Sequence, residues 1–142
     1  MKKHNAVAVL SLALAPLAAS AIEFTPENTE VVVAPGAWRD QQVAWFAAQE
    51  MTNFLSRAFG AKVPVKTDFN PKKCSIVLGS NTWSVTAGID TGALPQDGFA
   101  TRTKGNAVFI AGLDANQRPW YNHGCFARAT LFGAYALPGS GC

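Results

Sequence analysis

The stretch Cys74-Ser75-Ile76-Val77-Leu78-Gly79 is a short apolar run with two β-branched residues at its centre. A run of this length, preceded by polar residues and closed by a glycine, predicts a strand that is buried on both faces of a sheet. Such a strand needs neighbours on both sides and covering layers above and below, so the rest of the chain must provide them.

Segments on either side of this run have strand character. Residues 29–34 (TEVVVA) are rich in valine and end at a Pro-Gly turn. Residues 63–66 carry Pro64, which predicts an edge strand or a bulge. Residues 97–112 predict a hairpin, because residues 104–106 (KGN) form a turn signal and residues 107–111 (AVFIA) follow as an apolar strand.

Two helices are predicted to cover this sheet. Residues 38–59 place apolar side chains at helical spacing and end at Gly60, a typical residue just beyond a helix. A second helix is predicted over residues 124–137 and is expected to end at the Pro138-Gly139 pair. Between the strands, residues 80–96 form a long polar connection with one helical turn near 82–87. Gly133 is either a point of close approach to the sheet or a tolerated glycine.

The predicted order of elements is strand, long helix, two strands, hairpin, helix. The fold class is therefore α+β, an α/β sandwich with one mixed β-sheet and two main helices packed on one face. Length supports one domain, since 142 residues hold one core. A TIM barrel typically takes roughly 250 residues and is excluded.

The N-terminus predicts export. Lys2 and Lys3 precede an apolar run over residues 6–19, and Ala19-Ser20-Ala21 fits the small-residue pattern of signal cleavage. We therefore expect a signal peptide at 1–21 and a periplasmic or extracellular mature chain at 22–142, with no stable membrane span after cleavage. The alternative is an uncleaved N-terminal anchor.

Charge argues against a nucleic-acid partner. The formal net charge is +3, and no cluster of basic residues exceeds the Lys72-Lys73 pair.

No familiar catalytic or cofactor motif occurs, so the prediction is no cofactor, no metal and no catalytic residue in this chain. His123 is the one histidine after the expected signal, and a capping or surface role suits it better than catalysis. The carboxylates of Glu50, Asp90, Asp97 and Asp114 form no pair that the sequence brings together, and solvated or turn-forming roles are expected.

Three cysteines, Cys74, Cys125 and Cys142, would enter an oxidising compartment. One disulfide, no disulfide, or a loose Cys₃His zinc site with His123 all stay open, and the absence of any disulfide is favoured.

Aromatic residues in the connections are the candidate ligand-binding groups. Trp83 and the adjacent Trp120 and Tyr121 could stack on sugar rings if they are exposed, whereas Trp45 belongs to the long helix and to the core. A stand-alone secreted carbohydrate-binding module is therefore one hypothesis for the function.

Several segments, in this order and spacing, resemble a known family. The helix over residues 45–59 is followed by Gly60-Ala61-Lys62-Val63-Pro64-Val65, and residues 76–79, 94–99, 105–112 and 129–135 match further motifs. Together they are similar to the N-terminal, non-catalytic domain of α-glucuronidases and β-N-acetylhexosaminidase-like glycoside hydrolases. That domain also precedes glycosidase-like barrels of uncharacterised secreted proteins.

The resemblance implies an α/β sandwich that packs against a TIM barrel, and in the family the barrel holds the catalytic carboxylates. Family membership would mean a glycoside hydrolase context, yet the matching motifs contain no catalytic group. The chain departs from the family pattern at residues 116–125 and after residue 136. The resemblance therefore implies an accessory domain in polysaccharide breakdown, of the α-glucuronidase type that acts on xylan-derived glucuronides. We expect the chain to be truncated before its catalytic barrel. The expected partner is that barrel or a carbohydrate.

Overall fold

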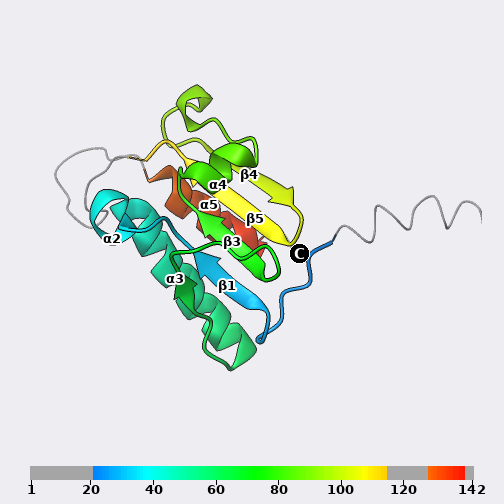
Figure 1. The fold of residues 1–142 in the computed structure, drawn as a ribbon. Coiled ribbons are helices and arrows are strands. Elements are labelled where there is room, and N and C mark those ends of the chain that lie inside the picture. Colours follow the sequence, from blue (N-terminus) through cyan, green and yellow to red (C-terminus); the bar gives the residue numbers. More distant parts are fainter. Residues whose placement is uncertain (1–20, 115–127, 140–142) are drawn as a thin grey trace, which may run out of the picture.

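The computed structural model describes residues 21–114 and 128–139 and contains one five-stranded sheet with strand order β2-β1-β3-β5-β4. Strands β2, β1, β3 and β5 run parallel to one another, and the edge strand β4 pairs antiparallel with β5. The predicted α+β class with one mixed sheet is confirmed (Figure 1). In chain order the elements are β1 (Thr29–Val32), α2 (Ala37–Asp40), α3 (Gln42–Phe59), β2 (Val65–Lys66), β3 (Cys74–Leu78), α4 (Thr82–Thr86), the 3₁₀ helix η1 (Thr91–Ala93), β4 (Phe99–Lys104), β5 (Ala107–Gly112) and α5 (Ala129–Gly139).

Strand β3 lies at the centre of the sheet, as its apolar run predicted, and all five of its residues are buried. Because successive side chains of a strand point to opposite faces, Ile76 and Leu78 enter one core and Val77 enters the other. Pro64 lies just before the two-residue edge strand β2. At this position its missing N–H removes no hydrogen bond between paired strands.

The first face of the sheet is covered by α3 and α5, so the prediction that both main helices share a face is confirmed. Val43, Ala47 and Met51 of α3 pack there together with Leu131 and Ala134 of α5. Gly133 is a point of close approach: a Cβ there would lie 2.5 Å from Cγ2 of Ile110.

The second face is covered by the long connection between β3 and β4, so this segment packs as a layer. Ile89 is buried against Val77 and Phe109, and Trp83 and Phe69 pack around them. In Figure 1, α4 lies on the opposite side of the sheet from α5. The sheet is therefore enclosed by two main helices on one face and by a thinner layer on the other.

The long helix predicted over residues 38–59 is broken at Gln41, whose backbone has φ −134° and ψ 61°. The break directs the Gln41 side chain toward the end of β3, where its Nε2 donates a hydrogen bond to the Ser80 carbonyl over 2.8 Å. Ser80 lies 39 residues after Gln41 in the sequence, so helical periodicity could not predict this contact. Near the C-terminal end of α3, Leu55 packs against the core, whereas Phe54 is 44% exposed.

The second helix ends later than predicted. It starts at Ala129, after Arg128, which forms a bridge with Asp114; residues 124–127 of the predicted helix lie outside the described residues. The helix also continues through Gly139, two residues past the predicted end at residue 137. The earlier end was predicted because proline lacks an N–H and clashes with the preceding turn of a helix. Helix ends commonly vary by one or two residues.

The predicted hairpin is confirmed, and its turn uses Gly105 at φ +59°. The predicted signal peptide at 1–21 lies almost wholly outside the described residues. Within residues 21–114 and 128–139, every helix is too short or too polar to cross a bilayer.

Candidate functional site

Trp83 is held in place by a capped helical turn. Asn81 precedes α4, and its Oδ1 accepts hydrogen bonds from the backbone N–H groups of Trp83 (3.1 Å) and Ser84 (3.0 Å). In return the Ser84 Oγ accepts a hydrogen bond from the Asn81 backbone N–H over 2.9 Å, which completes a capping box. Two reciprocal bonds therefore orient the start of α4, and with it the Trp83 side chain over the second face.

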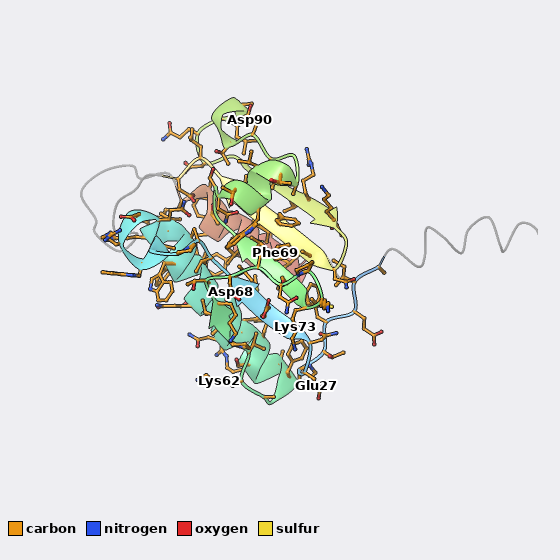
Figure 2. All side chains as sticks on the ribbon, viewed as in Figure 1. Glu27, Lys62, Asp68, Phe69, Lys73 and Asp90 are labelled. Atoms are coloured by element: carbon orange, nitrogen blue, oxygen red, sulfur yellow. The ribbon has the colours of Figure 1, made fainter. Side chains whose placement is uncertain are left out.

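Around Trp83 the structure forms an apolar hollow of about 300 Å³. Its walls include the aromatic rings of Phe69, Trp83 and Phe109, together with Ala87. The Phe69 ring centroid lies 6.0 Å from that of Trp83 and 5.8 Å from that of Phe109, both within the range of aromatic contacts. Figure 2 shows Phe69 over the sheet, on the loop that joins β2 to β3. Three separate segments thus supply one aromatic surface.

The rim of this hollow is polar. Thr86 contributes from α4, and Lys104 and Asn106 contribute from the β4–β5 turn. The Thr86 hydroxyl donates to the Thr82 carbonyl over 2.7 Å, which leaves its oxygen able to accept a further hydrogen bond. We name the hollow and this rim the Trp83 pocket. Its residues are Phe69, Trp83, Thr86, Ala87, Lys104, Asn106 and Phe109. An aromatic wall with a few polar groups at its mouth suits a small ring-shaped ligand with one apolar face.

Sequence reasoning identified Trp83 but not the residues that surround it. Phe69 is an apolar residue in an otherwise polar loop, and this contrast could have identified it as a site residue. Phe109 lies between Val108 and Ile110 in β5 and points to the opposite face of the sheet from them. The other two predicted aromatic residues, Trp120 and Tyr121, lie outside the described residues.

The candidates for metal or thiol chemistry are only partly described. Cys74 is buried and free, and its thiol donates to the Glu23 carbonyl over 3.5 Å. Cys125, Cys142 and His123 lie outside the described residues, so the pairing and zinc alternatives are untested. Among residues 21–114 and 128–139, no group of three or more histidine, cysteine or acidic residues is placed to hold a metal ion.

Each of the four candidate carboxylates accepts a hydrogen bond from the surrounding fold. Asp90 caps η1 through the Gly92 N–H at 3.0 Å, and in Figure 2 it lies at the tip of its loop. Asp97 accepts from the Arg128 N–H, and Glu50 accepts from the Tyr135 hydroxyl at 3.2 Å. Asp114 accepts from the Thr130 N–H at the start of α5 over 2.8 Å. Asp97 and Asp114 thus contact the same segment, Arg128 and Thr130 at the start of α5, whereas Asp90 and Glu50 lie elsewhere in the fold.

A second hollow of about 450 Å³ lies at the carboxyl ends of β3 and β5, and Gln41, Ser80, Leu113 and Asp114 are among its lining residues. Burial raises the pKa of the Asp114 carboxyl above its ordinary value, although hydrogen bonds from Thr130 oppose the rise. The described residues stop at Asp114 of this hollow and resume at Arg128. We therefore take the Trp83 pocket, with its three aromatic rings, as the candidate site.

Buried polar groups also occur beneath the second face. Glu30 of β1 is 6% exposed, and its Oε1 accepts a hydrogen bond from the Ser75 Oγ over 3.3 Å. Glu30 does not line the Trp83 pocket. The pair joins neighbouring strands and is assigned to the sheet interior.

Neither family models nor curated proteins match the sequence. Among solved structures, the chain is similar to a family GH115 4-O-methyl-α-glucuronidase described as having specificity for decorated arabinogalactans. The match has a TM-score of 0.50 at 16% identity, and covers 77% of this chain but 13% of the glucuronidase. At this identity the likeness concerns the fold. The chain thus has the fold of one small part of a glycoside hydrolase.

Proposed function

We propose that this chain is an exported accessory domain of a glycoside-hydrolase-like protein and does not itself cleave glycosidic bonds. The observation that carries the proposal is the fold match, in which most of this chain corresponds to a small part of a glucuronidase. An independent support is the order of sequence motifs, which resembles the N-terminal domain that precedes a catalytic barrel in α-glucuronidases.

The proposed partner is a glycosidase-like barrel. A barrel of this kind typically takes roughly 250 residues, many more than the 142 of this chain. We expect the DNA that follows codon 142 to encode such a barrel, in the same or another reading frame. Unrelated coding sequence in that position would argue against the proposed partnership.

Non-catalytic behaviour can be tested directly. We expect the purified chain to release no product from aryl glucuronides or aryl hexosaminides. The four candidate carboxylates support this expectation because each has a structural hydrogen bond: Asp90 caps η1, Asp97 and Asp114 accept from the start of α5, and Glu50 accepts from Tyr135 between α3 and α5. Turnover that survives repurification and disappears in His123→Ala would contradict the proposal.

Export is the second part of the proposal and has its own test. The basic start and the small residues at 19–21 predict a mature N-terminus at Ile22. Mass spectrometry of the chain recovered from the periplasm or medium of a bacterial host should find that terminus. Recovery of the intact chain in the membrane fraction would favour the alternative of an uncleaved anchor.

A carbohydrate-binding role is the second candidate function, and the Trp83 pocket is the observation that favours it. Its aromatic walls could pack against the apolar face of a sugar, while Thr86 and Asn106 exchange hydrogen bonds with hydroxyl groups. Glycan-array binding by the purified chain tests this role. Binding that Trp120→Ala abolishes and Trp83→Phe leaves unchanged would place the ligand elsewhere.

A further inference from the structure

We infer that the outer edge of β4 binds an extended acidic segment of another polypeptide, which pairs with β4 and extends the sheet by one strand. This inference goes beyond the proposed function and does not rest on it. It is argued from the hydrogen-bonding pattern of β4, from the charges along that strand and from the way in which those charges would meet a second copy of the chain.

The direction of the backbone groups in β5 determines which residues of β4 face outward. The carbonyl groups of Asn106, just before β5, and of Ile110, within it, accept hydrogen bonds from the N–H groups of Ser75 and Gly79 on the β3 side, over 3.0 and 2.9 Å. Because backbone groups alternate in direction along a strand, the odd-numbered residues of β5 bond to β4 instead. The register pairs these residues with the even-numbered residues of β4.

The outer side of β4 is therefore a row of unpaired backbone groups. Phe99, Thr101 and Thr103 turn their N–H and C=O groups outward, and all three residues are exposed. Strand β4 ends the strand order, so no other described strand pairs with this side. The opposite edge strand, β2, has two residues, whereas β4 has six. Such a row of groups is a template for an added strand.

Arg102 and Lys104 give this edge a positive charge. Both are exposed, and their side chains lie on the second face, since the register pairs them with residues of β5 that enter the second-face core. Within residues 21–114 and 128–139, neither of them forms a salt bridge. A strand laid along β4 places every second side chain beside these two, and carboxylates are the complementary groups.

The guanidinium of Arg102 already contacts one of the outward carbonyl groups. Its Nη1 donates a hydrogen bond to the Thr101 carbonyl over 3.0 Å. An added strand supplies a backbone N–H to this carbonyl and frees the guanidinium, which then donates to a carboxylate of the same strand. One hydrogen bond in the free chain is thus replaced by two in the complex.

The same charges argue against a second copy of this chain as the occupant. If two β4 strands pair antiparallel around a two-fold axis at Thr103, Arg102 of each copy lies opposite Lys104 of the other. An axis at Thr101 brings the two copies of Arg102 to diagonal positions. Like charges placed in this way destabilise a pair of strands, and a segment with carboxylates at alternate positions avoids the repulsion.

Fluorescence anisotropy of labelled heptapeptides tests the inference on the purified chain. The probe is the peptide TVEVEVT with an amidated end and a neutral dye, and the matched peptide TVQVQVT keeps the shape but removes the charge. We expect the acidic peptide to bind about tenfold more tightly, the combined effect of two exposed ion pairs, and the advantage to shrink as salt is raised. Equal binding of the two peptides, or binding of neither, would overturn the inference.

Backbone methylation of the probe separates strand addition from simple charge attraction. Alternate residues of an added strand point their N–H groups toward β4, so methylating the central valine nitrogen and methylating the nitrogen of the glutamate before it affect opposite edges of the peptide. We expect one of these two peptides to lose binding and the other to retain most of it. Equal effects of the two methylations would overturn the pairing.

Variants of the chain locate the site. The double change Arg102→Gln and Lys104→Gln should remove the preference for the acidic peptide. The control is Lys62→Gln with Lys66→Gln, two exposed lysines in and near the opposite edge strand, and it should preserve the preference. Thr101→Pro removes an outward N–H and no bond to β5, so it should abolish binding of both peptides. Circular dichroism of each variant confirms that the fold is retained.

Two further outcomes would overturn the inference. A wild-type dimer in analytical ultracentrifugation that Thr101→Pro dissociates would mean that β4 pairs with a second copy. A preference lost in the control variant and kept without Arg102 and Lys104 would place the acidic segment at the β2 edge. Neither outcome bears on the accessory-domain proposal, which has its own tests.

Discussion

Gly133 of α5 lies directly against Ile110 of β5, so close that an added Cβ would come within 2.5 Å of the Ile110 Cγ2. Phe99 of β4 would also be 2.9 Å away, through its Cδ2. No real Cβ occupies such a space without displacing its neighbours, and Ile110 is fully buried. The absence of a side chain at position 133 therefore sets how closely α5 approaches the sheet.

Replacing Gly133 with alanine should destabilise the protein, although helix propensity alone favours alanine by about 1 kcal/mol. Overpacking of a tight core typically costs roughly 1 to 3 kcal/mol, so the clash should determine the sign. Urea unfolding followed by circular dichroism measures the change in the free energy of unfolding. Ala136→Gly, at an exposed position of the same helix, provides the propensity baseline. A more stable Gly133→Ala variant would show that α5 does not pack as described.

Gly79 follows β3 with φ +94°, and a Cβ there would lie 2.8 Å from the Ala44 Cβ of α3. Gly79→Ala should therefore lower the free energy of unfolding through both backbone strain and contact with the helix, by about 2 kcal/mol or more. Gly88→Ala is the matched control, since Gly88 has φ +96° but nothing within 4 Å of the added Cβ. The difference between the two variants in urea unfolding measures the packing part alone, and equal losses would refute a close approach of α3.

Asp114 caps the start of α5 from a strand end 16 residues earlier in the chain. Asp114→Ala removes the acceptor for the Thr130 N–H and should cost about 0.5 to 2 kcal/mol. Asp114→Asn keeps a side-chain oxygen in that position and should retain most of the stability. Thermal melts of both variants at neutral pH test this ranking, and an equal loss in both would mean that the charge, not the acceptor, stabilises the helix.

The same residue predicts a pH dependence. Burial raises the pKa of Asp114 above its ordinary value of 3.8, so the folded state holds the proton more tightly than the unfolded state. Its contribution to stability is therefore greatest below pH 3.8 and declines as pH rises through the higher pKa of the folded state. Asp114→Asn lacks this titration. In urea unfolding at a series of pH values, the free energy of unfolding of the wild type minus that of Asp114→Asn should decrease as pH rises. A difference that grows with pH would contradict the direction of the pKa shift.

Asn81 orients α4, the helix that carries Trp83. Asn81→Ala removes the acceptor for two backbone N–H groups and should lower the free energy of unfolding by about 0.5 to 2 kcal/mol. Asn81→Ser is the matched variant, because serine is also a preferred residue at this position and should retain part of the stability. If Trp83 is displaced when the cap is lost, its tryptophan fluorescence should change in Asn81→Ala and much less in Asn81→Ser. Unchanged fluorescence in both would mean that contacts with Phe69 hold the indole ring without the cap.

Strand β3 and the β4–β5 hairpin were predictable because their signals are local. Burial of five successive residues in β3 follows from an unbroken apolar run, and Gly105 marks the turn of the hairpin. The break at Gln41 was not predictable, since it depends on a hydrogen bond to Ser80 in a distant loop. The start of α5 at Ala129 was likewise not predictable, because Asp114, which caps it through the Thr130 N–H, lies 16 residues before Thr130 in the sequence.

Alternation and periodicity along the chain determined the number of main elements, their types and the burial of the central strand, because each depends on neighbours within a few residues. Tertiary structure decided which aromatic residues meet. Phe69, Trp83 and Phe109 come from a loop, a short helix and a strand, and only the parallel alignment of β3 with β5 brings these segments over one face of the sheet. A binding surface assembled across such separations leaves no continuous pattern in the sequence, because its spacing is set by the sheet and not by the chain.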